Sequence, residues 1–119
     1  MYQTPTMPRT PKPLPAASLH IVLALLEGET HGYALTRRVH EQTNGAVRMG
    51  PGTLYGTLNR LVTDGLIVET TDRVSRSESE RRRYYELTPN GRVVALQELE
   101  RLQALVHHVS GYLTRGTTT

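Results

Sequence analysis

The residues whose types could do chemistry are concentrated on one face of a helix predicted over residues 51–65. On the other face, apolar side chains recur at i, i+4, i+7 and i+8, which predicts a buried stripe. The stripe comprises Leu54, Leu58, Leu61 and Val62. The polar face carries an amide, Asn59, which pairs well with adenine, and a guanidinium, Arg60, which suits guanine or phosphate. This face therefore predicts binding to duplex DNA. Its members are Thr53, Gly56, Thr57, Asn59, Arg60 and Thr63.

A second group of cations lies beyond this helix, over residues 73–83. Arg81, Arg82 and Arg83 stand next to Tyr84, so a cationic flap would flank the helix and contact phosphates. Glutamates dilute the charge in the middle of the segment. We therefore expect the base of the flap, rather than its tip, to contact DNA.

Three glycines near the start of the helix allow a competing interpretation. Glycine in a helix interior costs roughly 0.5–1 kcal/mol relative to alanine, so Gly50, Gly52 and Gly56 indicate a partner close to the backbone. A dinucleotide could be that partner, because Glu69 lies roughly where a ribose-binding acid would fall. However, no buried parallel strand precedes the glycines, and the chain has too few β-α units. The sequence favours a DNA groove.

The histidines and serines show no pattern typical of catalysis or of a metal site. His107 and His108 are adjacent and diverge by about 100° on a helix, which is not the i, i+4 geometry of a zinc pair. No serine stands at a sharp strand-to-helix turn. We therefore expect no enzyme, no metal site and no cofactor.

Three short helices are predicted to position the candidate residues. Residues 16–28 are almost entirely apolar, which indicates a helix buried on most sides. A second helix over residues 30–45 has Thr30 as its predicted N-cap, and Pro51 suits the first position of the third helix, over residues 51–65. Three consecutive helices with tight joints fit a helix-turn-helix unit.

Two β-prone stretches follow, residues 66–71 and 81–88, and they pair most simply as an antiparallel hairpin. The period-two alternation of apolar residues in the two stretches predicts that they share one face of the hairpin. That face comprises Leu66, Val68, Tyr85 and Leu87. Thr88 and Pro89 then predict the cap and first turn of a last helix over residues 89–113. The predicted fold class is mostly α with a small antiparallel β-hairpin (α+β), a winged helix-turn-helix with a long C-terminal helix.

The last helix carries more apolar surface than one winged domain can cover. Its apolar residues recur in steps of three and four, as in a coiled-coil seam. Burying five such side chains at about 1.5–3 kcal/mol each would contribute on the order of 10 kcal/mol before entropy costs. We expect a homodimer, and folding of the stripe onto its own domain is the alternative. The predicted dimerisation residues are Leu96, Leu99, Leu102, Val106, Val109 and Leu113.

Length and composition fit a single domain. The chain has 119 residues, a net charge of +3 and no cysteine. No apolar run approaches the roughly 18 residues of a membrane span, and we expect a soluble cytoplasmic protein. The proline-rich residues 1–16 predict a disordered tail, 17–88 the winged domain, 89–113 the dimerisation helix and 114–119 a second disordered tail.

Three blocks resemble the PadR family of transcriptional regulators. They are HGYAL at 31–35, GTLYGTLNRLVTDGLI at 52–67 and RRYYELTPNGR at 82–92, and with their spacers they span about residues 17–113. The resemblance, to the small subfamily that lacks a large C-terminal domain, implies a dimeric winged-helix DNA binder with its third helix in the major groove. It also implies Tyr33 at a helix start and Tyr55 at the head of the recognition helix. The predicted DNA-binding residues are Tyr33, Thr53, Tyr55, Asn59, Arg60, Arg81, Arg82 and Arg83.

The expected function is that of a homodimeric repressor that binds a palindromic operator in double-stranded DNA. Some small members of the family bind flat aromatic drugs between their terminal helices through tryptophan, but this chain has neither Trp nor Phe. Leu105 and Tyr112 could line a pocket for a small hydrophobic effector, and a dry helix seam fits at least as well. Three classes stay open: a ligand-responsive repressor, a ligand-independent DNA binder, and a winged-helix module that binds protein instead of DNA.

Overall fold

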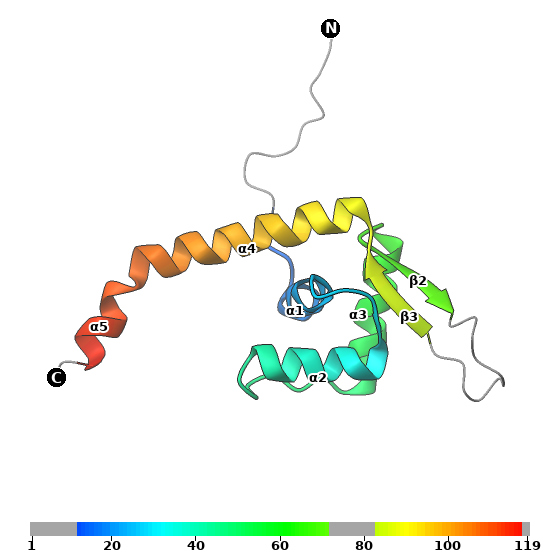
Figure 1. Cartoon of the computed structure of the whole chain (residues 1–119), viewed down its shortest axis with the longest axis horizontal. Helices are drawn as coiled ribbons and strands as arrows, with labels where there is room; N and C mark the ends of the chain where they lie inside the picture. The colour runs from blue at the N-terminus through cyan, green and yellow to red at the C-terminus, as the bar shows by residue number, and fades with distance from the viewer. Residues whose placement is uncertain (1–11, 72–82, 118–119) are drawn as a thin grey trace, which may run out of the picture.

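The computed structural model describes residues 12–71 and 83–117. In chain order the elements are α1 (Ala16–Leu25), β1 (Thr30–His31), α2 (Gly32–Gln42), α3 (Pro51–Thr63), β2 (Ile67–Thr71), β3 (Arg83–Leu87), α4 (Pro89–Val109) and α5 (Gly111–Thr117). The first three helices and the sheet form the body, and α4 projects from the body as a long rod that ends in α5 (Figure 1). The predicted fold class is confirmed.

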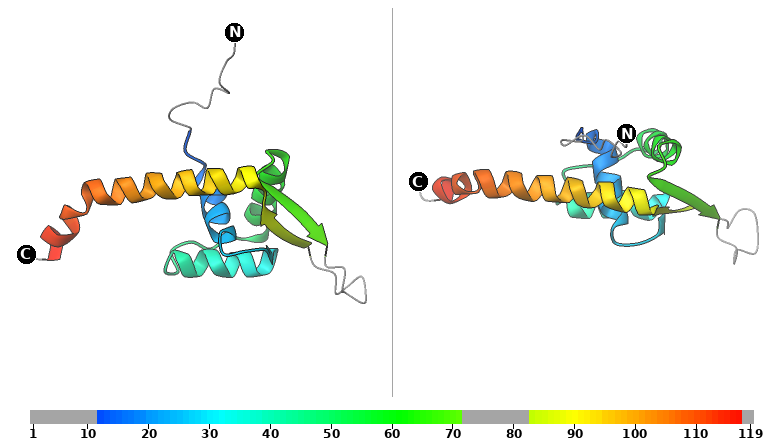
Figure 2. Two further views of the ribbon diagram at one scale, coloured as in Figure 1. Left: turned by 45° about the horizontal axis from the view of Figure 1, so that its top comes forward. Right: turned by 90° about the horizontal axis from the view of Figure 1, so that it is seen from above.

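The core forms around α1, which lies between α4 and α2 (Figures 1 and 2). Its side chains are buried on most sides, as predicted, and they contact the inner faces of α2 and α3. The fully buried aliphatic residues of this core include Ile21, Val22, Leu35, Val39, Leu58, Leu61 and Ile67. Val62 was predicted to belong to the buried stripe of α3, and that prediction is wrong because the residue is 39% exposed. One residue step turns a helix by about 100°, so Val62 faces away from the core beside Leu61.

Arg38 on α2 fastens the end of α1. Its guanidinium donates hydrogen bonds to the carbonyl oxygens of Gly28, at 2.8 Å, and Ala24, at 3.2 Å. The Ala24 carbonyl also accepts from the backbone N–H of Glu27 at 3.2 Å, and Gly28 lies just beyond the end of α1. The arginine therefore ties α2 both to the last turn of α1 and to the turn that follows it. The carboxylate of Glu27 lies 3.9 Å from the same side chain. Arg38 is therefore engaged within the fold.

The predicted β2–β3 hairpin is confirmed, and a third strand extends it. The sheet order is β1-β3-β2, with both pairings antiparallel. Thr30 was predicted to cap α2, but it pairs with Tyr85 in β1. The cap of α2 is His31, whose ring nitrogen Nδ1 accepts from the backbone N–H of Ala34 at 3.3 Å.

The register of the hairpin corrects the predicted apolar face. Ile67 lies opposite Leu87, and Val68 lies opposite Glu86. Directly opposed residues share a face, so Ile67 joins Tyr85 and Leu87 against the core. Ile67 is 2% exposed and Val68 is 41% exposed. Val68 was therefore assigned to the wrong face.

Thr88 joins the sheet to α4, which begins as the Thr88-Pro89 pair predicts. The Thr88 hydroxyl accepts from the backbone N–H of Gly91 at 2.9 Å and donates to the carbonyl of Gly65 at 2.7 Å. Its backbone N–H donates to the carbonyl of Leu66 at 3.0 Å. One residue thus caps α4 and holds it against the turn between α3 and β2.

Replacing Thr88 with alanine is expected to lower the free energy of unfolding by about 1–2 kcal/mol, because an N-cap is lost. Each kcal/mol corresponds to roughly 4–8 °C in melting temperature for a domain of this size. Thermal unfolding at equal protein concentration measures the change. Thr88→Ser keeps the hydroxyl and serves as the control. A melting temperature of Thr88→Ala within 1 °C of the wild type would show that the cap is not stabilising.

The end of the chain differs from the prediction. The last helix was predicted to run to residue 113 and to give way to a disordered tail, but α4 ends at Val109 and α5 covers Gly111–Thr117. No proline interrupts residues 111–117, so nothing in this stretch prevents helix formation. The Arg115 guanidinium lies 5.0 Å from the centre of the Tyr112 ring, within the range of a cation–π interaction. Residues 1–11 and 118–119 of the predicted tails lie outside the described residues.

Candidate nucleic-acid interface

Helix α3 presents two distinct faces. Leu54, Leu58 and Leu61 are at most 3% exposed and hold the helix against the core. The predicted contact residues Thr53, Asn59 and Arg60 are exposed on its outer surface. Within the described ranges the Arg60 guanidinium has no carboxylate partner. The outer face of α3 is therefore free to bind a partner through an amide, a guanidinium and a hydroxyl.

The three glycines at the head of α3 are not required by packing within the described chain. A Cβ atom built on Gly50, Gly52 or Gly56 would meet no atom within 4 Å. Side chains would fit there, and they would project outward from α3. Because these positions carry no side chains, the head of α3 is narrower on its outer face, and a binding partner can come close to its backbone.

Tyr55 joins α3 to the start of α2. A Cβ atom built on Gly32 would lie 2.7 Å from the Tyr55 hydroxyl oxygen, so the phenol rests against the α2 backbone where only glycine leaves room. Tyr55 is 42% exposed, and Tyr33, next to Gly32, is 72% exposed. The structure thus brings together, at one place, the two tyrosines that the family resemblance predicts as DNA contacts.

The base of the wing, the β2–β3 hairpin, holds one predicted contact residue, Arg83. Its Nε lies 3.4 Å from a carboxylate oxygen of Glu69, which partly offsets its charge, and its side chain is 69% exposed. Burial, reinforced by Glu69, raises the pKa of the Tyr85 hydroxyl, and Arg83 opposes the rise. Arg81 and Arg82 lie outside the described residues.

The observed fold contradicts the alternative interpretation that the glycines bind a dinucleotide. All the strands in the described ranges pair antiparallel, so there is no parallel β-α unit to present the glycines to a pyrophosphate. Glu69 pairs with Arg83 in the hairpin. A ribose-binding role for Glu69 has no support in this arrangement.

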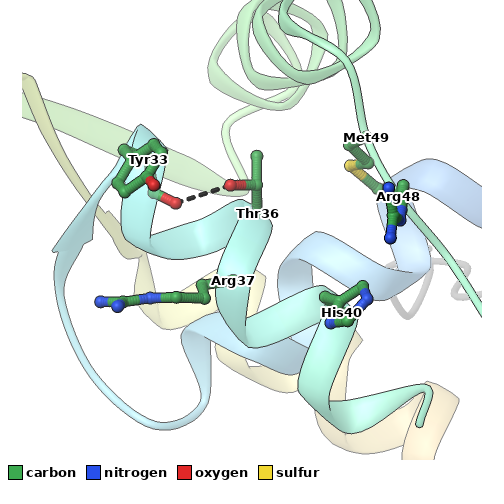
Figure 3. Close-up of a pocket in the computed structure, with 6 residues that line it drawn as sticks. All are labelled: Tyr33, Thr36, Arg37, His40, Arg48 and Met49. Carbon is green, nitrogen blue, oxygen red and sulfur yellow. Dashed lines mark hydrogen bonds between the residues drawn. The ribbon is translucent and has the colours of Figure 1, made fainter. Parts of the chain in front are cut away.

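A hollow that the sequence did not predict lies beside the head of α3. It has a volume of about 380 Å³ and opens between α2 and the segment that leads into α3 (Figure 3). Four of its lining residues recur along one face of α2, and two precede α3. They are Tyr33, Thr36, Arg37, His40, Arg48 and Met49. The sequence around Arg48 could not predict the hollow, because the hollow depends on how α2 packs against the loop that contains this arginine.

Two further properties concern only residues 12–71 and 83–117. No group of three or more metal-ligating side chains is found among them. None of their helices is long and apolar enough to cross a membrane.

Comparison with known families tests the resemblance found in the sequence. The model of the transcriptional regulator PadR-like family matches residues 22–101. The chain belongs to the PadR-like family. The match covers α2, α3, the sheet and the first half of α4, so it includes the face of α3 and the residues around Tyr33 described above. The resemblance seen in three short blocks is confirmed. The PadR-like family is one of transcriptional regulators, in agreement with the expectation that the chain is not an enzyme.

One sequence relative and two solved structures are similar to this chain. The transcriptional regulator Rv3488 of Mycobacterium tuberculosis is 38% identical over 96 residues, which cover 81% of this chain and 84% of that protein. A PadR family regulator of Clostridium difficile superposes with a TM-score of 0.69 at 23% identity, over 83% of this chain and 99% of that one. Bacillus subtilis PadR, solved in complex with operator DNA, superposes with a TM-score of 0.63 at 23% identity. The alignment with PadR covers 74% of this chain but 48% of that protein.

Proposed function

We propose that this PadR-like regulator is a homodimeric repressor that binds a palindromic operator, with α3 of each protomer in the major groove. The observation that carries the proposal is the outer face of α3, where Thr53, Asn59 and Arg60 are exposed on a helix whose other face is locked into the core. A rigid helix with a narrow, glycine-bearing head suits the width of the major groove. The solved complex of Bacillus subtilis PadR with operator DNA supports this assignment.

The proposed dimer rests on exposed apolar residues along α4 and on α5. Most of the predicted dimerisation residues are between 40% and 72% exposed, and Leu102 is half-buried. The exposed ones are Leu96, Leu99, Val106, Val109 and Leu113. Figure 2 shows that the C-terminal part of α4, together with α5, lies away from the rest of the chain. The alternative, in which the stripe folds back onto its own domain, therefore has no support, and a second copy would remove these side chains from water.

Arg60→Ala is expected to weaken binding to a duplex enriched from a random pool by the wild-type chain. The loss should be about 1–3 kcal/mol for each half-site, because a guanidinium that reads a base edge is removed. Fluorescence anisotropy with the enriched duplex and with an unrelated duplex measures the preference.

Arg92→Ala, which removes an exposed arginine on α4, is the charge-matched control. The preference of Arg92→Ala should equal that of the wild type. An Arg60→Ala chain with full preference would contradict the assignment of α3. A wild-type chain that prefers no duplex would favour the protein-binding alternative.

The proposal includes an effector that releases the DNA. Leu105 and Tyr112, the residues expected to line its pocket, are 56% and 67% exposed on the last two helices. In the proposed dimer they would lie near the paired rods, where a small hydrophobic molecule could insert between them. Displacement of the bound duplex by phenolic compounds or hydrophobic cations supports this regulation, and an unchanged complex favours a ligand-independent regulator.

A further inference from the structure

We propose that the Glu69 carboxylate on β2 competes with DNA phosphates for Arg83 at the base of the wing, and so lowers the sequence-independent affinity of the chain for DNA. The assignment rests on the proposed function. It gives a role to an acidic residue that lies beside an expected DNA contact. Glu69 would set how tightly the wing binds, although it binds no DNA itself.

Glu69 and Arg83 lie on the same face of the β2–β3 hairpin. Glu69 is directly opposite Tyr85, and Arg83 is directly opposite Thr71, so the two charged residues are diagonal neighbours across the strands. Residues two apart on a strand share a face, and on this face Tyr85 is buried against the core, whereas Glu69 and Arg83 are exposed. The pair therefore lies where this face leaves the core and meets solvent.

The contact between the two charges is close and open to competition. The Oε2 atom of Glu69 lies 3.4 Å from Nε of Arg83, and the arginine side chain is the more exposed of the two. An exposed ion pair of this kind is weak, whereas a guanidinium can bind a phosphate through two parallel hydrogen bonds. A phosphate can therefore displace the carboxylate, but binding is weaker by what the ion pair contributes.

The fold does not depend on this pair. Its two strands are already joined by a register of five residue pairs, from Ile67 opposite Leu87 to Thr71 opposite Arg83. In contrast, Arg38 bonds the carbonyl oxygens at the end of α1. Because the hairpin is held by its backbone, substitution of Glu69 should change the charge of the wing and leave its shape intact.

Glu86 offers a matched comparison on the neighbouring strand. It lies directly opposite Val68, on the other face of the hairpin from Glu69, and it is exposed. No ion pair of Glu86 is found in the described parts of the chain. Glu86→Gln therefore removes the same charge from the same sheet without removing a partner of Arg83.

Glu69→Gln is expected to tighten binding to the enriched and the unrelated duplex by the same factor. The gain should be about two- to fivefold at 0.1 M salt for each protomer in contact, because an exposed ion pair no longer competes. The slope of log K against log salt should steepen by up to about 0.9 per protomer, since Arg83 then displaces a further counterion. Glu86→Gln should leave the slope unchanged. Fluorescence anisotropy over a salt series measures both quantities.

A double variant separates competition for Arg83 from simple repulsion between Glu69 and DNA. In a chain that already carries Arg83→Ala, Glu69→Gln should change the affinity by less than about twofold, because the cation for which the carboxylate competes is absent. Thermal unfolding of each variant checks the hairpin, and the melting temperatures should match that of the wild type because both side chains are exposed.

The outcomes distinguish failure of this assignment from failure of the proposed function. Unchanged or weaker binding by Glu69→Gln, with a wild type that prefers the enriched duplex, overturns only the role of Glu69. An equal gain for Glu86→Gln, or an equal gain in the Arg83→Ala background, overturns it too, since net charge alone would then explain the effect. A gain confined to the enriched duplex would indicate contact with bases and also overturns it. A wild type that holds no duplex overturns both proposals.

Discussion

Replacing Gly91 with alanine is expected to lower the free energy of unfolding by about 3 kcal/mol or more, because the added methyl group would overlap backbone atoms. A Cβ atom at Gly91 would overlap the carbonyl oxygen of Leu66 and lie 2.7 Å from its carbonyl carbon. Both atoms belong to the backbone, so no side-chain rotation relieves the clash. The first turn of α4 would have to leave the α3–β2 turn, and the Thr88 hydrogen bonds to Gly65 and Gly91 would be strained.

Gly56→Ala is the matched control for this substitution, because it adds the same methyl group to another helix where nothing lies within 4 Å. Gly56→Ala should raise the stability by about 0.5–1 kcal/mol. Urea unfolding at one protein concentration compares the two variants with the wild type. A Gly91→Ala chain as stable as the wild type would show that α4 does not need the close contact with Leu66.

Leu99→Arg is expected to produce a folded monomer that binds the enriched duplex at least about a hundredfold more weakly. Leu99 is 46% exposed in the single chain, so an arginine there costs the monomer little but would bury a charge between two rods. Two linked half-site contacts bind far more tightly than one, by a factor of about 10²–10⁴. Light scattering coupled to size exclusion gives the mass, and anisotropy gives the affinity.

Ala104→Arg is the control for the dimer. Ala104 is exposed and lies about 160° around the helix from Val106, on the side away from the predicted seam. The Ala104→Arg chain should stay dimeric and bind DNA as the wild type does. Equal masses for Leu99→Arg and the wild type, both dimeric, would place the dimer contact elsewhere on the chain.

Residues that mark where helices begin and end explain why most of the fold could be predicted. Pro51 and Pro89 stand at the first positions of α3 and α4, and Asn44 and Gly45, with φ of 53° and 82°, follow the end of α2. Such residues act through their own backbone, so they can be interpreted without knowledge of the tertiary structure. The polar face of α3 could be predicted for the same reason, because helical spacing fixes which residues share a face.

The features that could not be predicted depend on contacts between distant segments. The two residues of β1 are too few to show alternation, and three successive apolar residues at 66–68 fit either register of β2. Gly91 is needed only because the Leu66 carbonyl approaches it. Glu98, 4% exposed and bonded to Arg101 at 3.1 Å, would be expected on the surface from its charge alone.

Sequencing the duplexes that the wild-type chain retains from a random pool tests the central claim most directly. The account predicts an inverted repeat whose half-sites are centred about one helical turn, roughly 10 base pairs, apart or a multiple of this, since two copies of α3 related by a two-fold axis would each read one half-site. The same pool passed over Arg60→Ala should lose the conserved base within each half-site. A retained pool with no enriched sequence, or with a single unrepeated motif, would contradict the account.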